Sequence, residues 1–161
     1  MMHDEWLGVP ANIDDWLGFV YLVTAPSGKK YVGKKLFWSS TRKKPLKGKT
    51  RNRLGKKESD WRKYYGSSEE LKKELAATQG VGWKREILHL VRKRESGAGK
   101  CELALVELKV QMALNCFIRE DFFNKMLNVR LGVFPSDIPY HIIDELIDRL
   151  ILEHGRTSTL N

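Results

Sequence analysis

A β-hairpin near the amino terminus is the feature that most restricts how this chain can fold. Residues 19–33 read FVYLVTAPSGKKYVG, in which two segments rich in aromatic and β-branched residues flank the turn sequence Ala-Pro-Ser-Gly. In a hairpin with this loop length, Tyr21 and Tyr31 come close together across the strand pair. The glycine that follows opens the backbone in front of Lys34 and Lys35. Two phenols beside a cationic cluster suit a phosphodiester, and the alternative is an ordinary strand pair with two packing tyrosines.

The rest of the hydrophobic pattern predicts an α+β domain. Residues 67–78 predict a helix, with Ser67 as its N-cap and Glu70 completing a capping box. Residues 83–91 predict a third strand, and residues 101–115 predict a second helix. This order predicts a small central three-stranded mixed or antiparallel sheet flanked by helices, with an additional helix at the carboxyl end.

The chain divides into three predicted parts. Residues 1–17 form an irregular lead-in that its tryptophans pin to the body. Residues 18–131 form the main domain, which contains a basic insertion at about 39–57. Residues 132–161 form a carboxyl-terminal amphipathic helix and tail. The outer face of that helix is acidic and should avoid DNA, so the helix either docks on the body or pairs with a second copy.

Positive charge is concentrated in one part of the chain. The net charge is +9 and the pI is about 9.6, which favours a polyanionic partner. Between Lys29 and Lys63, fifteen Lys and Arg face only two acidic residues. The insertion at 39–57 has almost nothing to bury and is predicted to be a loop that is mobile without a ligand, either solvated or in contact with phosphates. Its nucleic-acid-binding candidates are Lys43, Lys44, Lys47, Lys49, Arg51, Arg53, Lys56 and Lys57.

One carboxylate lies on the apolar stripe of the second predicted helix. Leu103, Val106, Val110 and Leu114 recur at helical spacing. At 100° per residue, Glu107 falls about 40° from Leu103 and about 60° from Val110. Burying a carboxylate is costly unless it is paired, protonated or bound to a cation. Glu107 is therefore either a member of an ion pair at the edge of the stripe or a divalent-metal ligand facing the sheet.

Cysteine and histidine usage excludes other classes of site. Cys101 and Cys116 lie about four turns apart on one predicted helix, which is too far for a disulfide. They lack the partners of a zinc site, and the four histidines have no ligand spacing. We therefore expect reduced thiols and a cytoplasmic protein. No signal peptide or membrane span is predicted.

The tyrosine segments resemble the signature of a nuclease family. Residues 19–21 (FVY) and 31–33 (YVG) are similar to the two signature tripeptides of GIY-YIG nucleases, at a separation which that family uses. The first matches at its tyrosine, and the second differs by one conservative change. With the lysines that follow, residues 58–68 and Glu107, the chain resembles small phage-type, Seg-like homing endonucleases over residues 18–130.

The resemblance implies a metal-dependent DNA endonuclease that hydrolyses phosphodiester bonds, of homing type or of relaxed specificity. In such enzymes the metal-binding glutamate corresponds to Glu107, rather than Glu102, and the ion is Mg²⁺ or Mn²⁺. Tyr21, helped by Tyr31, would orient or deprotonate the attacking water. The sequence does not distinguish which of the two phenols is the base. Because phenols ionise near pH 10, the lysines and the cation should lower the pKa of the one that is.

The family pattern also implies residues that neutralise charge and support the site. The implied catalytic set is Tyr21, Tyr31, Arg42, Glu107, Lys34, Lys35 and Asn124. Arg42 lies eleven residues after Tyr31, near the position of the family arginine, although Arg51 or Arg53 could reach the same place. Asn128 could likewise take the role of Asn124.

The implied partner is double-stranded DNA, with no membrane, in the host bacterial cytoplasm if the chain is phage-encoded. The protein would be a monomer, or a homodimer through the carboxyl-terminal helix. Two rival functions remain at this stage. One is a catalytically inactive basic nucleic-acid-binding module, and the other is an inhibitory protein whose basic loop holds an acidic protein partner.

Overall fold

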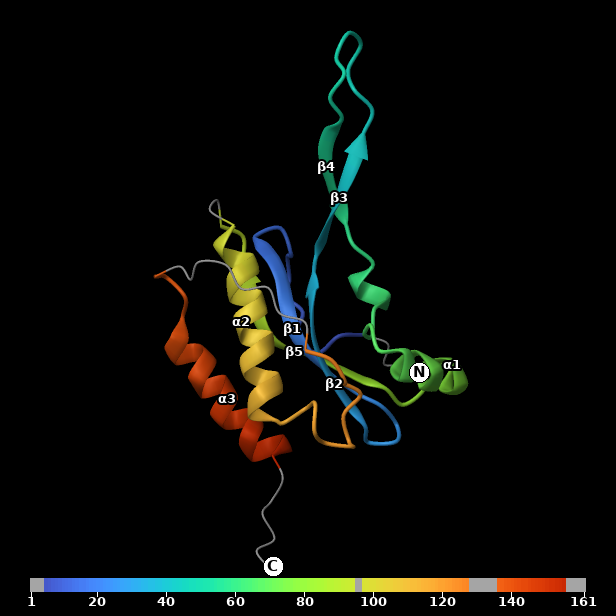
Figure 1. The fold of residues 1–161 in the computed structure, drawn as a ribbon, viewed down its shortest axis with the longest axis vertical. Coiled ribbons are helices and arrows are strands. Elements are labelled where there is room, and N and C mark those ends of the chain that lie inside the picture. Colours follow the sequence, from blue (N-terminus) through green and yellow to red (C-terminus); the bar gives the residue numbers. More distant parts are fainter. Residues whose placement is uncertain (1–4, 95–96, 128–135, 156–161) are drawn as a thin grey trace, which may run out of the picture.

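A three-stranded antiparallel sheet forms the centre of the molecule (Figure 1). The computed structural model describes residues 5–94, 97–127 and 136–155. The sheet has the order β2-β1-β5, with β1 (Trp16–Thr24) between β2 (Lys30–Leu36) and β5 (Lys84–Arg92). Both neighbours run antiparallel to β1. The predicted α+β fold is confirmed, and the sheet is antiparallel throughout rather than mixed.

The central strand is buried on both of its faces. Val20 and Leu22 point to one side of the sheet, whereas Phe19, Tyr21 and Val23 point to the other. A strand covered on both sides reads as a continuous apolar run, which explains the FVYLV sequence. The sheet therefore separates two hydrophobic clusters.

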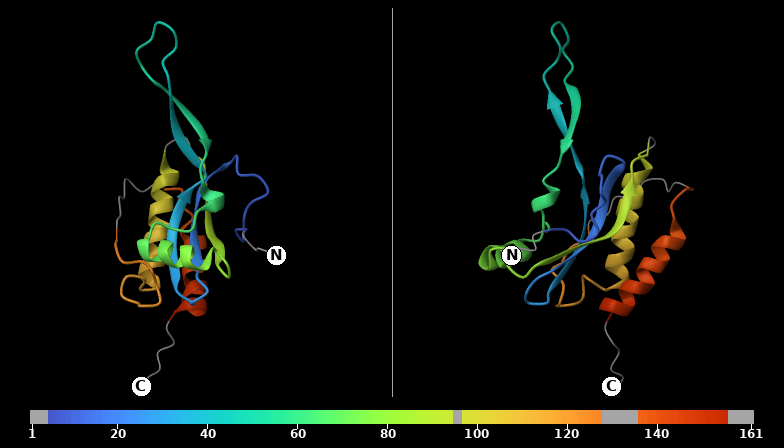
Figure 2. Two further views of the ribbon diagram at one scale, coloured as in Figure 1. Left: turned by 90° about the vertical axis from the view of Figure 1, so that its right-hand side faces the viewer. Right: turned by 180° about the vertical axis from the view of Figure 1, so that it is seen from behind.

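Two helices cover the first face. The helix α2 (Ala98–Ala113) packs on the sheet, and α3 (Tyr140–His154) packs on α2 (Figure 2). The apolar face of α3 is buried in the same cluster as the α2 stripe, and Lys109 Nζ pairs with Asp144 Oδ1 at 2.7 Å. Of the two arrangements expected for this helix, docking on the body is the one the structure shows.

Aromatic side chains fill the second face. The helix α1 (Glu69–Thr78) and the short 3₁₀ helix η1 (Trp61–Lys63) lie here. Trp6 is buried in this cluster, and its Nε1 donates to the carbonyl oxygen of Trp61 at 2.9 Å. The predicted pinning of the lead-in by tryptophan is confirmed for Trp6.

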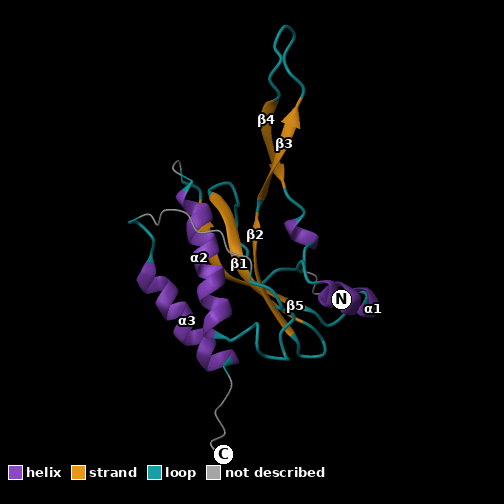
Figure 3. Cartoon of the chain, in the orientation of Figure 1, coloured by secondary structure: helices purple, strands orange, loops and turns teal. Residues whose placement is uncertain are grey.

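The basic insertion is a β-hairpin, and the prediction of an irregular loop is wrong. The strands β3 (Trp38–Lys43) and β4 (Arg53–Glu58) form a separate two-stranded antiparallel sheet. We call residues 38–58 the arm. The arm extends away from the body in every view (Figures 1–3). The backbone groups between β3 and β4 pair with each other over residues 38–43 and 53–58, and the outer edges of both strands face solvent.

The predicted helix starts need small corrections. Ser68, not Ser67, is the N-cap of α1, and its Oγ accepts a hydrogen bond from the Leu71 amide at 3.4 Å. The expected capping box does not form, because with Ser68 as N-cap the third helical position is Leu71, and Glu70 pairs with Lys29 instead. The helix α2 ends at Ala113, so Cys116 lies beyond it. None of the described helices is long and apolar enough to cross a membrane.

Candidate active site

An open cavity of about 660 Å³ lies at the β2 edge of the central sheet. It collects five of the seven implied catalytic residues: Tyr21, Tyr31, Lys34, Glu107 and Asn124 all line it, together with Tyr64. Its acidic rim residues Glu69 and Glu70 are paired with lysines. The edge of the sheet is thus the point where the predicted site residues meet.

Tyr21 reaches this edge from the middle of the sheet by passing over a glycine. Tyr21 in β1 is directly opposite Gly33 in β2. A Cβ atom placed on Gly33 would lie 2.5 Å from Tyr21 Oη and 2.9 Å from Tyr31 Cε1. Any side chain at position 33 would therefore collide with both rings. The glycine in the second signature tripeptide is needed for close approach, not for an unusual backbone angle.

The two tyrosine rings lie close together, as predicted. Their centroids are 6.1 Å apart, and the Tyr64 ring lies edge-on to Tyr21 at 6.3 Å. Tyr31 Oη shares a hydrogen bond of 2.8 Å with Ser67 Oγ. Ser67 therefore orients a phenol instead of capping a helix.

Glu107 enters the cavity from the other face of the sheet. Its side chain is 16% exposed, and one carboxylate oxygen, Oε2, pairs with Lys34 Nζ. The other oxygen, Oε1, has a long contact of 3.5 Å with Gln111 Nε2. The carboxylate is neither in bulk solvent nor sealed in the core. Glu107 therefore forms the ion pair that the sequence offered as one alternative, and it also lines the cavity beside the tyrosines.

Glu102 on the same helix has a different environment. It is 2% exposed, and its oxygens pair with His89 Nε2 at 2.9 Å and with Arg94 Nη1 at 2.5 Å. These partners hold the pKa of Glu102 below its ordinary value despite the opposing effect of burial. Glu102 joins α2 to β5 and does not face the cavity. Of these two carboxylates, only Glu107 lines the cavity with the tyrosines.

Two buried amide side chains fix the strand between the phenol and the lysines. Asn124 Oδ1 accepts from the Val32 amide at 3.0 Å, and Asn124 Nδ2 donates to the Val32 carbonyl at 2.8 Å. Gln111 Nε2 donates to the same carbonyl at 3.1 Å. Asn124 thus positions β2, and its alternative, Asn128, lies outside the described residues.

The environment of Tyr21 opposes ionisation. Burial is the main cause, and together with Tyr31, Tyr64 and Glu107 it raises the pKa of Tyr21 well above its ordinary value of 10.0. The predicted lowering of this pKa by the lysines is not seen at Tyr21 in this arrangement, because the effect of burial dominates. Tyr21 is a protonated hydrogen-bond donor at neutral pH.

The cations have separate positions. Lys34 lines the cavity, whereas Lys35 pairs with Asp60 at 2.6 Å and lies over the Tyr64 ring at 3.8 Å. Arg42 is exposed on β3 and does not line the cavity, nor do its alternatives in the arm. The structure therefore does not bring Arg42 together with the tyrosines.

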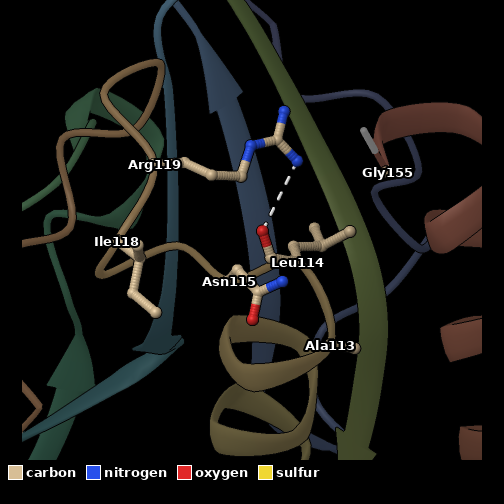
Figure 4. A pocket seen from close by; sticks show the side chains of 6 residues that line it. All are labelled: Ala113, Leu114, Asn115, Ile118, Arg119 and Gly155. Atoms are coloured by element: carbon tan, nitrogen blue, oxygen red, sulfur yellow. Dashed lines mark hydrogen bonds between the residues drawn. The ribbon is translucent and has the colours of Figure 1, made fainter. Parts of the chain in front are cut away.

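A smaller cavity near the end of α2 contains an arginine that is already engaged (Figure 4). Arg119 Nη1 donates to the carbonyl oxygens of Leu114, at 3.4 Å, and of His154, at 2.6 Å. Its Nε and Nη2 pair with the carboxylate of Asp121. This arginine ties the end of α3 to the body and does not replace the missing catalytic arginine. Among the described residues that line the larger cavity, none is an arginine.

Sequence reasoning missed Gln111 as a site residue. Gln111 lies four residues after Glu107, so its side chain belongs to the same face of the helix. That spacing was a usable signal. Tyr64 was not among the predicted site residues, and nothing in the local sequence places it beside Tyr21.

The donor chemistry of the cavity fits a hard divalent cation. Mg²⁺ binds oxygen ligands and keeps several of its waters, so one carboxylate in an open cavity is a suitable protein contribution. Glu107 is that carboxylate, and the ammonium group of Lys34 now supplies the positive charge beside it. Within the described part of the chain, no group of three or more His, Cys, Asp or Glu could hold a metal.

The cavity at the sheet edge of this α+β domain thus brings together Tyr21, Tyr31 and the carboxylate of Glu107. The family model described as "Putative endonuclease segE, GIY-YIG domain" matches residues 3–127. The chain therefore belongs to the GIY-YIG nuclease family and resembles the Seg endonucleases. Membership implies a nucleic-acid substrate. Comparisons with curated proteins and with solved structures gave no significant match.

Proposed function

We propose that the protein is a metal-dependent endonuclease that hydrolyses phosphodiester bonds of DNA in the cavity at the β2 edge. The observation that carries this proposal is the meeting of Tyr21, Tyr31 and Glu107 in one open cavity, although they come from opposite faces of the sheet. A structural role alone would not require a carboxylate and two phenols to converge beside a lysine.

The two phenols have different roles in this proposal. Tyr21 is buried and stays protonated, so its hydroxyl orients the phosphate or the attacking water by donating a hydrogen bond. Tyr31 lies toward the open side, where Ser67 fixes its hydroxyl. Tyr31 is therefore the better placed phenol to accept a proton from the water.

Glu107 and Lys34 account for the charge in the reaction. Mg²⁺ or Mn²⁺ bound at Glu107 would stabilise the negative charge that develops on the phosphate and on the leaving oxygen. Lys34, released from Glu107, would contact the non-bridging oxygens. This exchange lets the lysine take part of the role that the sequence assigned to Arg42.

Incubating the purified protein with supercoiled plasmid, with and without Mg²⁺, tests the proposal. We expect Mg²⁺-dependent nicking by the wild type and by Glu145→Gln, a matched control on the exposed face of α3. Glu107→Gln keeps the size of the side chain but removes its charge, and should abolish nicking while plasmid binding persists. Binding without nicking by the wild type would instead favour an inactive nucleic-acid-binding module.

The inhibitory-protein alternative makes a different prediction. It requires a tight complex with an acidic protein in salt that removes DNA from the basic residues. If wild-type protein neither binds nor nicks plasmid in low salt, both the endonuclease and the inactive nucleic-acid-binding module are excluded, and the inhibitory protein remains.

A further inference from the structure

The arm combines exposure, positive charge and regular strand geometry in a way that the cavity does not explain. Residues 39–57 belong to neither hydrophobic cluster among the described residues, and α1, α2 and α3 all pack elsewhere. Between Lys43 and Lys57 the arm carries eight cations and no acidic residue. A two-stranded ribbon of this kind has charge complementarity to a phosphate backbone on both of its sides.

The register of the arm divides its side chains between two faces. Directly paired residues of an antiparallel ladder point to the same side. The pairs Ser40–Lys56 and Arg42–Leu54 therefore share one face, which we call the reading face. All four of these side chains are exposed, and Leu54 is 81% exposed.

The opposite face is partly covered by the arm itself. It carries the pairs Thr41–Gly55 and Lys43–Arg53. A Cβ on Gly55 would lie 2.7 Å from both Lys43 Cε and Thr41 Oγ1, so the Lys43 stem lies across this face. The two faces thus differ: one presents free side chains, and the other presents a cation folded over its own backbone.

A groove connects the arm to the active-site cavity. This groove has a volume of about 780 Å³ and is lined by Lys35, Lys100 and the base of the arm at Trp38 and Ser40. Lys34 lines both the groove and the active-site cavity. A nucleic-acid backbone that runs from the cavity to the arm would therefore pass Lys34, Lys35 and Lys100, of which Lys34 and Lys35 pair with Glu107 and Asp60 in the structure.

We propose that the arm is a two-stranded β-ribbon that lies in the major groove of duplex DNA and reads base edges through Arg42, Leu54, Ser40 and Lys56. The duplex as partner rests on the proposed function. The major groove admits a two-stranded ribbon, whereas the minor groove is about half as wide. Arg and Lys recognise guanine, Ser accepts several partners, and an exposed apolar side chain suits the thymine methyl group. Lys43 and Arg53, on the opposite face, contact phosphates.

Equilibrium binding in EDTA, measured by fluorescence anisotropy on a short labelled duplex, tests the arm without any cleavage. Joining Ser40 to Lys56 through Asn-Gly shortens the hairpin to a two-residue turn and removes residues 41–55. The core is untouched, so the unfolding temperature should not change. We expect binding to weaken at least about tenfold at physiological salt. The slope of log K against log salt should become shallower by up to about six, because the deletion removes seven cations that contribute about 0.9 each.

Groove ligands distinguish insertion from surface contact. Methyl green, which occupies the major groove, should weaken binding by the wild type but not by the shortened variant. Netropsin, which occupies the minor groove, should leave wild-type binding unchanged. Unchanged affinity of the shortened variant, or insensitivity of the wild type to methyl green, would overturn the proposal.

A charge-matched pair of double variants tests the reading face. One double variant, Arg42→Ser with Lys56→Ser, changes the reading face. The other, Lys43→Ser with Arg53→Ser, changes the opposite face. Each removes two cations, so both should reduce the salt dependence of binding equally. In selection of binders from a randomised duplex pool in EDTA, only the first pair should lose the sequence enrichment seen with wild type. Equal enrichment with both pairs would overturn base reading by this face. Because these measurements need no cleavage, absent nicking with Mg²⁺ would refute the proposed function separately.

Discussion

The two sheets of this molecule are built on opposite principles. The strands of the central sheet are held by side chains that pack on both faces, and the cavity residues inherit fixed positions from that packing. The arm has no such packing beyond its base, and its regular structure comes from the pairing of β3 with β4. Packing therefore fixes the atoms of the central sheet in place, whereas the arm exposes its charged side chains to solvent.

This difference teaches what each region can do. Chemistry at a phosphodiester needs groups placed to within a fraction of an ångström, which a packed sheet supplies. Attraction to DNA depends on the number of cations and tolerates loose placement. We therefore expect the body to be sensitive to single atoms. We expect the arm to respond to total charge, except on the reading face, where individual side chains should affect sequence preference.

Removal of one oxygen from the body should have the largest effect. Tyr21→Phe deletes the hydroxyl but keeps the ring, so the aromatic cluster remains packed. We expect the Mg²⁺-dependent nicking rate to fall by about 10²–10⁴-fold, the usual range for a group that orients or transfers a proton. Tyr140→Phe, on the exposed side of α3, is the matched control. Nicking by Tyr21→Phe at the wild-type rate would show that this phenol only packs.

Loss of a buried charge comes next. Glu102→Gln leaves His89 and Arg94 without their carboxylate, and should destabilise the fold by about 3–5 kcal/mol in urea unfolding. Lys57→Gln in the arm should change stability by less than about 0.5 kcal/mol. Similar losses of unfolding free energy in the two variants would show that body and arm do not differ in this respect.

Asn124→Ala should have an intermediate effect. The variant loses both hydrogen bonds between Asn124 and Val32, one to the backbone amide and one to the carbonyl oxygen. We expect the free energy of unfolding to fall by about 1–3 kcal/mol. Because Val32 lies between Tyr31 and Gly33, the nicking rate should fall more than the stability loss explains. The comparison is made at a temperature where circular dichroism shows the variant fully folded. A normal rate under those conditions would mean that Asn124 contributes stability alone.

Acid should weaken the body before it affects the arm. Arg119 lowers the pKa of Asp121 below its ordinary value in the folded state, so the unfolded chain binds this proton more readily. The associated stability is present above the ordinary carboxyl pKa and is lost as pH falls through the lowered value. Asp121 is partly exposed, so we expect less than about 1 kcal/mol. Asp121→Asn should flatten that part of the stability curve in urea titrations at several pH values.

A single arm cation should have the smallest effect. Lys49→Gln, near the arm tip, should reduce the slope of log K against log salt by about one and weaken binding only a few-fold. Nicking of saturated plasmid should not change. A loss of tenfold or more from this one substitution would indicate a fixed contact at the tip, contrary to the idea of summed charge.

The sequence was informative wherever local burial determines structure. The tyrosine hairpin, the apolar stripe of α2 and the inward position of Glu107 follow from periodicity, which reports burial directly. The arm was missed for the same reason, because a ribbon with no buried face has no apolar alternation to detect. Charge density indicated a partner but not a shape.

Contacts between distant segments could not be predicted from local pattern. Asn124 binds Val32 across 92 positions of sequence, and Ser67 meets Tyr31 across 36. Counting residues from the second tyrosine identified Arg42, but the exposed hairpin carries it away from the cavity. The raised pKa of Tyr21 likewise depends on neighbours from three separate elements.

The absence of residues 39–57 from both hydrophobic clusters has an evolutionary consequence. Substitutions, insertions or a complete exchange of this segment carry almost no folding penalty, since nothing in the interior has to be repacked. If the arm reads the duplex as we propose, target preference would change with this segment while the cavity residues stay the same, and grafting a foreign hairpin at this position would transfer the foreign sequence preference.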